Sequence, residues 1–384
     1  MRVSPLGWGV AVAAVLGLGV GWWLGWVELA VLGAACAAAL LVALLMTVGR
    51  ARYGVTLDLA DRRVKIGQRA FGRIEVRNTA RRRSLPSRVE LPVGPRVAEL
   101  GVPGLAPGAS HDELFAVPTA RRSVVVVGPV RSVRGDPFGL ARRSVRWTRP
   151  VELFVHPLLV GLRGADAGLL RDLEGQSTRE LSDSDLSFHA LRDYVAGDDR
   201  RTIHWRTTAR RGTLMVKQFE DTKKTRTALA LATDPRDYVD PDGTDGEFEL
   251  AVSVVASIGV QTLRDQRDLT VLAGPGRLRV ETPPLLLDDC STLTTDAAGA
   301  GVALLGRRVA READDASVAI LVTGSVPDDS ELRLGARYVP PGTRTVVIRC
   351  RRGAEVAVRT QGPLTLATLG ELDDLPRLLR RAVS

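Results

Sequence analysis

The densest group of side chains able to do chemistry lies between residues 192 and 220, which read RDYVAGDDRRTIHWRTTARRGTLMVKQFE. Six arginines and three aspartates lie there with His204 and Trp205. A histidine near a carboxylate such as Asp198 transfers protons when a nucleophile is close. Clustered arginines instead bind phosphate or pair with carboxylates of the same chain. We favour an internal network that joins two domains, and the alternative is an exposed anion or partner site.

No catalytic constellation accompanies this segment. The sequence has no metal-binding HExxH spacing, no G-x-S-x-G nucleophile turn and no phosphate-binding P-loop. Its three cysteines are far apart and predict neither a disulfide framework nor a zinc site. Aromatic residues for stacking on bases are sparse, at 4% of the chain. We therefore expect no catalytic residue, no cofactor and no nucleic-acid partner.

Local signals predict how the segment folds. Asp198 and Asp199 can cap a helix over about 200–211, and Gly212 can end it in the left-handed conformation. Residues from Thr213 onward alternate like a strand. One side of the helix is expected to pack a buried tryptophan against a neighbouring sheet. That side comprises Trp205, Thr208, Ala209 and Gly212.

A family resemblance follows from two stretches of sequence. Residues 188–220 resemble the signature of the bacterial family called domain of unknown function 58, and GPVRSVRGDPFGL at 128–140 is similar to another segment of that family. The positions that match the signature are Arg192, Tyr194, Gly197, Asp198, Arg200, His204, Trp205, Ala209, Arg210, Gly212, Leu214 and Val216. The family has no established enzymatic activity.

The resemblance implies a C-terminal domain similar to the von Willebrand factor type A fold. It also implies partners, because members often accompany MoxR-type AAA+ ATPases and transglutaminase-like membrane proteins. Type A domains often hold a divalent metal through a D-x-S-x-S motif and a later Thr and Asp. Here both serines are missing, Arg236 stands where a hydroxyl ligand should be, and the later loop lacks the aspartate. The degenerate positions, at which we expect no metal, are Asp234, Arg236, Thr323 and Ser325.

The elements around these positions predict an α/β domain over 223–384. Buried apolar runs alternate with amphipathic stretches, which indicates a mostly parallel, Rossmann-like sheet covered on both faces. The runs DLTVLAG and LRVET flank Pro275-Gly276 and predict a hairpin with one antiparallel edge strand. Ligands usually bind such sheets beyond the carboxyl ends of the strands. The alternative function is therefore a ligand- or metal-binding enzyme with its site near Asp234 and Thr323.

Residues 53–160 predict an all-β sandwich, because short β-branched or alternating runs are separated by Gly, Pro and charged turns. A basic, turn-rich loop at 77–88 interrupts them. This loop suits a lipid-headgroup contact, and the alternative is a plain exposed loop. Residues 161–222 form the signature segment that links the two domains.

The N-terminus predicts a transmembrane hairpin over 1–52, with spans at about 6–26 and 29–49. Glu28 and three tryptophans mark a tip at the interface, and Arg2, Arg50 and Arg52 flank the other end. The soluble domains are then cytoplasmic, and the protein is a multi-pass protein of the cell membrane. A cleaved signal peptide is the weaker alternative, because the second apolar stretch would still anchor the product.

Basic residues concentrate in the N-terminal part. Residues 1–150 carry 22 Lys and Arg against 9 Asp and Glu, whereas residues 151–384 carry 31 against 35. This asymmetry predicts a surface that faces anions such as phospholipid, although a solvated arginine-rich face gives the same counts. Together these features predict a membrane-anchored cytosolic interaction or scaffold protein that works with a MoxR-type ATPase in envelope protein assembly or maturation.

Overall fold

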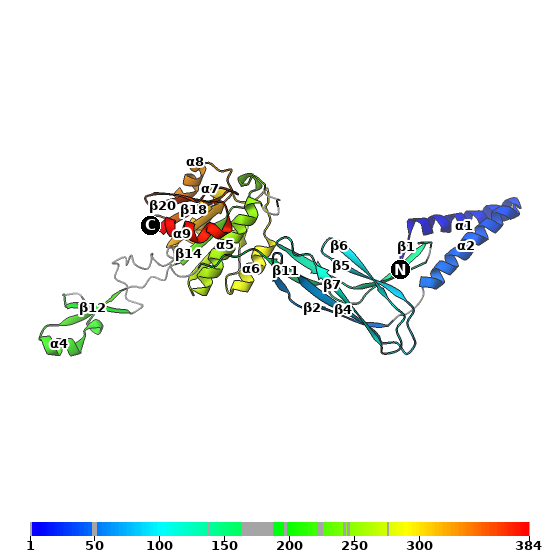
Figure 1. Cartoon of the computed structure of the whole chain (residues 1–384), viewed down its shortest axis with the longest axis horizontal. Helices are drawn as coiled ribbons and strands as arrows, with labels where there is room; N and C mark the ends of the chain where they lie inside the picture. The colour runs from blue at the N-terminus through cyan, green and yellow to red at the C-terminus, as the bar shows by residue number, and fades with distance from the viewer. Residues whose placement is uncertain are drawn as a thin grey trace. The chain divides into compact units, whose positions relative to one another are not determined.

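The computed structural model describes residues 2–47, 52–136, 138–162, 187–195, 198–220, 226–240, 243, 246–274 and 276–383. The chain divides into two compact units between His156 and Pro157 (Figure 1). The first unit contains the apolar helices and the β domain, residues 53–156. The second contains the signature segment and the α/β body, residues 226–383.

Two apolar helices form an antiparallel pair at the N-terminus, α1 (Pro5–Leu24) and α2 (Val27–Thr47). Gly25 ends α1 with a left-handed φ of 69°. Small residues let the backbones approach, since a Cβ on Gly17 would lie 2.8 Å from the Cα of Gly33. Trp22 and Trp23 expose 89% and 83% of their surfaces. Both helices are long and apolar enough to cross a membrane, as the sequence predicts.

The β domain consists of two sheets with a shared apolar core. One sheet has the order β2-β4-β7, and the other has the order β1-β10-β9-β5-β8-β11-β3 with β6 on β5. Alternate residues of β4 are buried, and Ile74 and Leu91 lie fully inside. The strands are β1 Arg2–Val3, β2 Tyr53–Leu59, β3 Arg63–Lys65, β4 Ala70–Asn78, β5 Ser87–Val93, β6 Arg96–Val102, β7 Ser110–Val117, β8 Ser123–Val127, β9 Arg131–Gly135, β10 Ala141–Arg146 and β11 Val151–His156.

Two details distinguish the domain from a simple antiparallel sandwich. Strand β3 pairs in parallel with β11, and the N-terminal strand β1 joins the domain by pairing with β10. Neither is visible in the sequence, because both pairings join segments far apart in the chain. The second pairing attaches the start of α1 to the β domain.

The described part of the signature segment is a hairpin of β12 (Ser187–Asp193) and β13 (Met215–Glu220). Between them lie a 3-10 turn, η2 (Arg200–Thr202), and helix α4 (Trp205–Arg211). The expected continuous helix is therefore wrong, because Ile203 forms an isolated bridge with Val216 in β13 and breaks it. The expected left-handed stop at Gly212 is confirmed, with φ 74°.

The α/β body is built on a sheet with the order β16-β15-β14-β17-β18-β20-β19. Its interior neighbours are parallel, and the edge strands β16 and β19 are antiparallel. The hairpin after β15 is confirmed, but its second strand is two residues long and ends before LRVET. The strands are β14 Arg226–Leu231, β15 Asp268–Ala273, β16 Gly276–Arg277, β17 Val318–Thr323, β18 Arg344–Cys350, β19 Ala357–Gln361 and β20 Leu364–Leu369.

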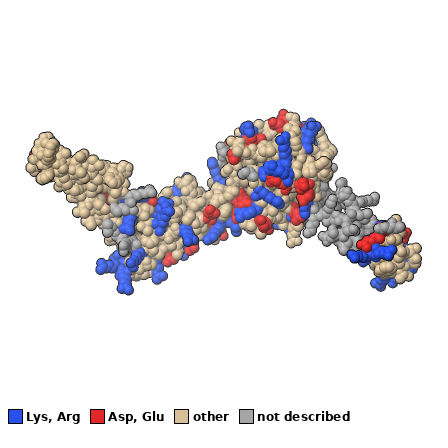
Figure 2. All heavy atoms as spheres, turned by 180° about the vertical axis from the view of Figure 1, so that it is seen from behind, with Lys and Arg blue, Asp and Glu red and all other residues tan. Residues whose placement is uncertain are grey.

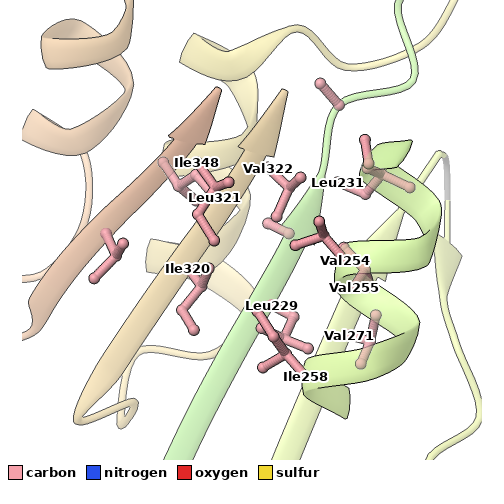
Figure 3. Packing of buried hydrophobic residues seen from close by; sticks show 14 of the residues in the cluster. Leu229, Leu231, Val254, Val255, Ile258, Val271, Ile320, Leu321, Val322 and Ile348 are labelled. Carbon is pink, nitrogen blue, oxygen red and sulfur yellow. The ribbon is translucent and has the colours of Figure 1, made fainter. Parts of the chain in front are cut away.

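Helices cover this sheet on both faces. Helices α5 and α7 both contact β14, β15 and β17, so they lie on opposite faces, and α6 packs on α5 while α8 packs on α7. Figure 3 shows Val254, Val255 and Ile258 of α5 directed at the β14 side chains in the core. The helices are α5 Glu247–Arg264, α6 Pro283–Thr292, α7 Val302–Glu312, α8 Asp329–Arg337 and α9 Leu375–Val383, with 3-10 turns η3 Pro235–Asp237 and η4 Leu372–Asp374.

Candidate functional site

The candidate site lies at the carboxyl ends of β14 and β17. From β14 the chain passes through α5 to β15 on one side, and it later returns through α7 to β17 on the other side. This reversal makes a topological switch point, where loops diverge and open α/β sheets bind ligands. The loops after the two strands carry the four positions predicted from the sequence.

Asp234 and Arg236 form a bidentate pair at the start of η3. Asp234 is buried, with 5% exposure, and the Arg236 side chain is 82% exposed. Nε of Arg236 donates to Oδ1 at 3.0 Å, and Nη2 donates to Oδ2 at 2.6 Å. These hydrogen bonds hold the pKa of Asp234 below its usual range. The pair leaves one guanidinium edge directed away from the carboxylate.

Asp237 is also buried and lies in the same loop. The hydroxyl of Thr323 donates to its Oδ2 at 3.1 Å, and the backbone N–H of Val302 at the start of α7 also donates to it. Burial, together with the charges of Asp234 and Glu331, raises the pKa of Asp237 to about 6. Its carboxyl group therefore titrates near neutral pH, which is unusual for an aspartate.

Glu247, which the sequence did not indicate, joins three elements at the site. It opens α5 and is buried, with 6% exposure. Its Oε2 accepts from the backbone N–H of Ser325 at 3.0 Å and of Val239 at 3.2 Å. The carboxylate thus fixes both loops to the start of α5. An acidic residue at a helix start was the only sequence signal, and it is common at ordinary helix ends.

Two exposed valines flank the polar group. Val239 exposes 72% of its surface and Val326 exposes 54%. The backbone N–H of Val326 donates to the carbonyl oxygen of Asp237 at 3.2 Å. Gly324 allows this close approach, since a Cβ there would overlap the same carbonyl oxygen. The loops of the site therefore carry an exposed arginine held by Asp234 and two exposed valines whose backbones are hydrogen-bonded.

The donors at the site do not fit a divalent cation. Both oxygens of Asp234 accept from Arg236, Asp237 accepts from Thr323 and Val302, and Glu247 accepts two backbone N–H groups. Among the described residues, no group of three or more His, Cys, Asp or Glu side chains is arranged to hold a metal ion. The guanidinium of Arg236 binds the carboxylate of Asp234, which a metal ion would need as a ligand.

The signature segment has a different polar arrangement. Arg192 donates to both oxygens of Asp198, with Nη1 to Oδ2 at 2.6 Å and Nη2 to Oδ1 at 2.7 Å. These bonds lower the pKa of Asp198 to about 2. His204 caps α4 through Nδ1, which accepts from the backbone N–H of Thr207 at 3.3 Å. In the structure the carboxylate of Asp198 therefore binds Arg192.

The rest of the signature is mostly exposed. Trp205 exposes 65% of its surface, and α4 has no buried residue, so the expectation of a buried tryptophan is wrong. The backbone of Tyr194 donates to the carbonyl oxygen of Leu214 at 2.9 Å. Gly197 lies outside the described residues. Exposed signature positions are Arg200, Ala209, Arg210, Gly212 and Leu214, whereas Val216 is buried.

The family comparison matches residues 190–284 to the model of a protein of unknown function, DUF58. The chain contains a DUF58 family segment. The matched part of this DUF58 protein includes the signature segment and continues through β14, α5 and β15. Asp234, Arg236, Asp237 and Glu247 therefore lie in the family segment, and Thr323 and Ser325 lie beyond it.

Three solved structures resemble parts of this chain. A CARDB domain from Pyrococcus furiosus is 11% identical, covering 28% of this chain and 91% of that chain with a TM-score of 0.22. The C-terminal domain of wzt is 10% identical, covering 29% and 78% with a TM-score of 0.23. A beta-glucosidase from Listeria innocua is 10% identical, covering 26% and 17% with a TM-score of 0.18. No curated protein matches the chain.

Proposed function

We propose that this DUF58 protein is a membrane-anchored docking protein whose α/β body binds a partner protein at the switch point. The observation that carries this proposal is the Asp234–Arg236 pair, in which a buried carboxylate holds an 82% exposed arginine side chain. An arginine held in this way loses little conformational entropy when it binds a carboxylate of a partner.

The neighbourhood of Arg236 supports protein binding over catalysis. Val239 and Val326 are exposed, and the hydrogen bonds of Glu247 and Asp237 hold their backbones. Strong protein-binding sites commonly combine an arginine anchor with apolar contacts that exclude water. The carboxylates of the site are engaged by groups of the chain itself, so they act as supports.

The two apolar helices support a location at a bilayer. Helices α1 and α2 expose their large apolar side chains, as membrane spans do. The arginines that flank the open end of the hairpin favour cytoplasmic soluble domains. The proposed location is therefore the cell membrane, with both units in the cytoplasm.

The partner that we propose is a MoxR-type AAA+ ATPase, on the strength of the family resemblance. The proposal includes an α/β body similar to the von Willebrand factor type A fold, which agrees with its parallel sheet and covering helices. A transglutaminase-like membrane protein is a further partner of the same kind. The process would be assembly or maturation of envelope proteins.

Capture of the ATPase tests this function. Full-length protein in nanodiscs is incubated with a purified MoxR-type ATPase from the same organism, loaded with ATP or with ADP, and empty nanodiscs serve as the control. We expect retention by the loaded nanodiscs that depends on the nucleotide. Equal retention by empty nanodiscs, or none in either nucleotide state, contradicts the proposal.

A second candidate function rests on Asp237. A carboxyl group with a pKa of about 6 at a switch point is suited to bind a ligand or to move a proton. Isothermal titration of the full-length protein with Mg²⁺, Mn²⁺ and nucleotides separates the candidates. Tight binding that is lost in Asp234→Ala favours the ligand-binding enzyme, and no binding by the unsubstituted protein rejects it for these ligands.

A further inference from the structure

The loop after β4, residues 79–86, presents three consecutive arginines on a fixed backbone. Arg81, Arg82 and Arg83 are exposed, and Leu85 beside them exposes 70% of its surface. The buried Asn78 side chain donates to the carbonyl oxygens of Arg82 and Leu105, both at 2.9 Å. The backbone is therefore ordered while the arginine side chains are exposed, although Nε of Arg83 also donates to the carbonyl oxygen of Gly104 at 3.4 Å. We call residues 79–86 the arginine loop, and Figure 2 shows basic side chains gathered at one end of the β domain.

Hydrogen bonds join the arginine loop to Arg52, which follows the apolar hairpin in the chain. The backbone N–H and the hydroxyl of Thr79 both donate to the carbonyl oxygen of Arg52 at 2.9 Å. Arg52 follows Thr47, the last residue of α2, by five positions. A chain spans at most about 3.6 Å per residue, so Arg52 lies within roughly 18 Å of the helix end. If α2 spans the bilayer, the loop lies within reach of the headgroups.

The turn between β9 and β10 gives a second attachment to the same end of the hairpin. The carbonyl oxygen of Leu140 accepts from the backbone N–H of Ser4 at 3.0 Å, directly before α1. The Leu140 side chain is buried in a cluster with Ala43 of α2. Asp136 shapes the turn, since its Oδ1 accepts from the N–H of Phe138 at 2.9 Å. Phe138 exposes 71% of its surface where the helices leave the β domain, as aromatic residues at bilayer interfaces do.

We propose that the face of the β domain formed by the arginine loop and Phe138 lies on the bilayer and binds anionic phospholipid headgroups. This inference rests on the membrane anchor of the proposed function and adds a second, electrostatic contact to it. Each basic residue near an anionic surface strengthens attachment by roughly fivefold, so three arginines act by on the order of a hundredfold. The contact would fix the orientation of the β domain relative to the bilayer, which the anchor alone would leave free.

The other end of the same sheet supplies an internal control. In the pairing of β2 with β4, Tyr53 lies opposite Asn78 and Leu59 lies opposite Gly72. Arg62 and Arg69 follow and precede these strands at the far end, and both are exposed. The intervening strand is about 20 Å long, which exceeds the Debye length of about 10 Å at 0.1 M salt. These arginines should not sense the lipid charge.

Arginine-specific modification tests the proposal on the full-length protein. The protein is placed in nanodiscs of phosphatidylcholine alone or with phosphatidylglycerol, treated with phenylglyoxal, and each arginine is followed by mass spectrometry. We expect modification of Arg81–Arg83 to slow by roughly tenfold or more with phosphatidylglycerol, and the slowing to fade in 1 M salt, where the Debye length is about 3 Å. Arg62 and Arg69 should react equally in both lipids.

Each other outcome overturns the inference. Equal rates in both lipids show that the arginine loop does not contact headgroups, and equal slowing at Arg62 and Arg69 shows a general lipid effect. If inorganic phosphate slows the modification of Arg81–Arg83 equally in phosphatidylcholine nanodiscs, the arginine loop is a site for free anions instead. Alkaline carbonate extraction measures hairpin insertion separately. An inserted hairpin without loop protection rejects this inference alone, whereas failure of insertion rejects the anchor.

Discussion

At the scale of residues, three carboxyl groups at the switch point have three different environments. Asp234 is neutralised by Arg236, Glu247 accepts from loop backbones, and Asp237 is buried and accepts from Thr323 and Val302. The sequence predicts the first of these from a degenerate motif. It could not predict Glu247, because the backbone group of Ser325 that it binds is 78 residues away.

Asp237→Asn is expected to change the dependence of stability on pH. The pKa of Asp237 is about 6 in the folded protein against an ordinary 3.8, so the folded state holds the proton more tightly. Stability from this group is fully present below pH 3.8 and is lost as pH rises through about 6. The neutral asparagine should therefore be more stable than aspartate above pH 6, by about 1–3 kcal/mol.

Urea denaturation of the full-length protein in nanodiscs at pH 4 and at pH 7.5 measures this difference. Thr323→Val is a second variant for this measurement. It removes the hydroxyl donor and leaves the carboxyl group of Asp237 buried. If Asp237→Asn changes the free energy of unfolding by the same amount at both pH values, Asp237 does not titrate in this window.

At the scale of elements, close helix contacts decide the geometry around the site. Gly306 in α7 faces Gly335 in α8, and a Cβ on Gly306 would overlap the carbonyl oxygen of Gly335. Arg307 and Tyr338 reinforce this crossing with a hydrogen bond of 2.6 Å. The start of α7 also supplies the N–H that binds Asp237, so the packing of the two helices positions the site.

Gly306→Ala should therefore separate α7 from α8. The overlap involves backbone on both helices and cannot be relieved by a rotamer change, so we expect a loss of about 2 kcal/mol despite the better helix propensity of alanine. Gly276→Ala is the control, because its Cβ would meet no atom within 4 Å. Thermal unfolding of both variants compares them, and equal melting temperatures would contradict the close packing.

The sequence predicts elements well where their own residues determine them. The parallel strands of the α/β body are continuous apolar runs, and the left-handed end of α4 follows from Gly212. Tertiary contacts overrode the local pattern elsewhere. The bridge of Ile203 to Val216 interrupted the predicted helix, and strand β12 was missed because its pairing with β13 lies across the loop.

At the scale of the whole molecule, the sequence predicts a hairpin, a β domain and an α/β domain joined by a signature segment, and each is described in the structure. The attachments between hairpin and β domain were not predictable, because Thr79, Leu140 and their partners lie in different parts of the chain. Whether the signature arginines join the two units stays a prediction.

Arg210→Ala should lower the melting temperature if the signature arginines join the two units. It should weaken partner binding alone if these arginines form an exposed surface.

The affinity of the nanodisc-held protein for nucleotide-loaded MoxR-type ATPase, measured by interferometry for two arginine variants, tests the central claim. Arg236→Gln removes the guanidinium fork at the switch point, and Arg264→Gln removes an exposed arginine at the last turn of α5. The account predicts a loss of about tenfold or more for Arg236→Gln and no change for Arg264→Gln. Equal affinities for both variants and the unsubstituted protein would contradict docking at the switch point.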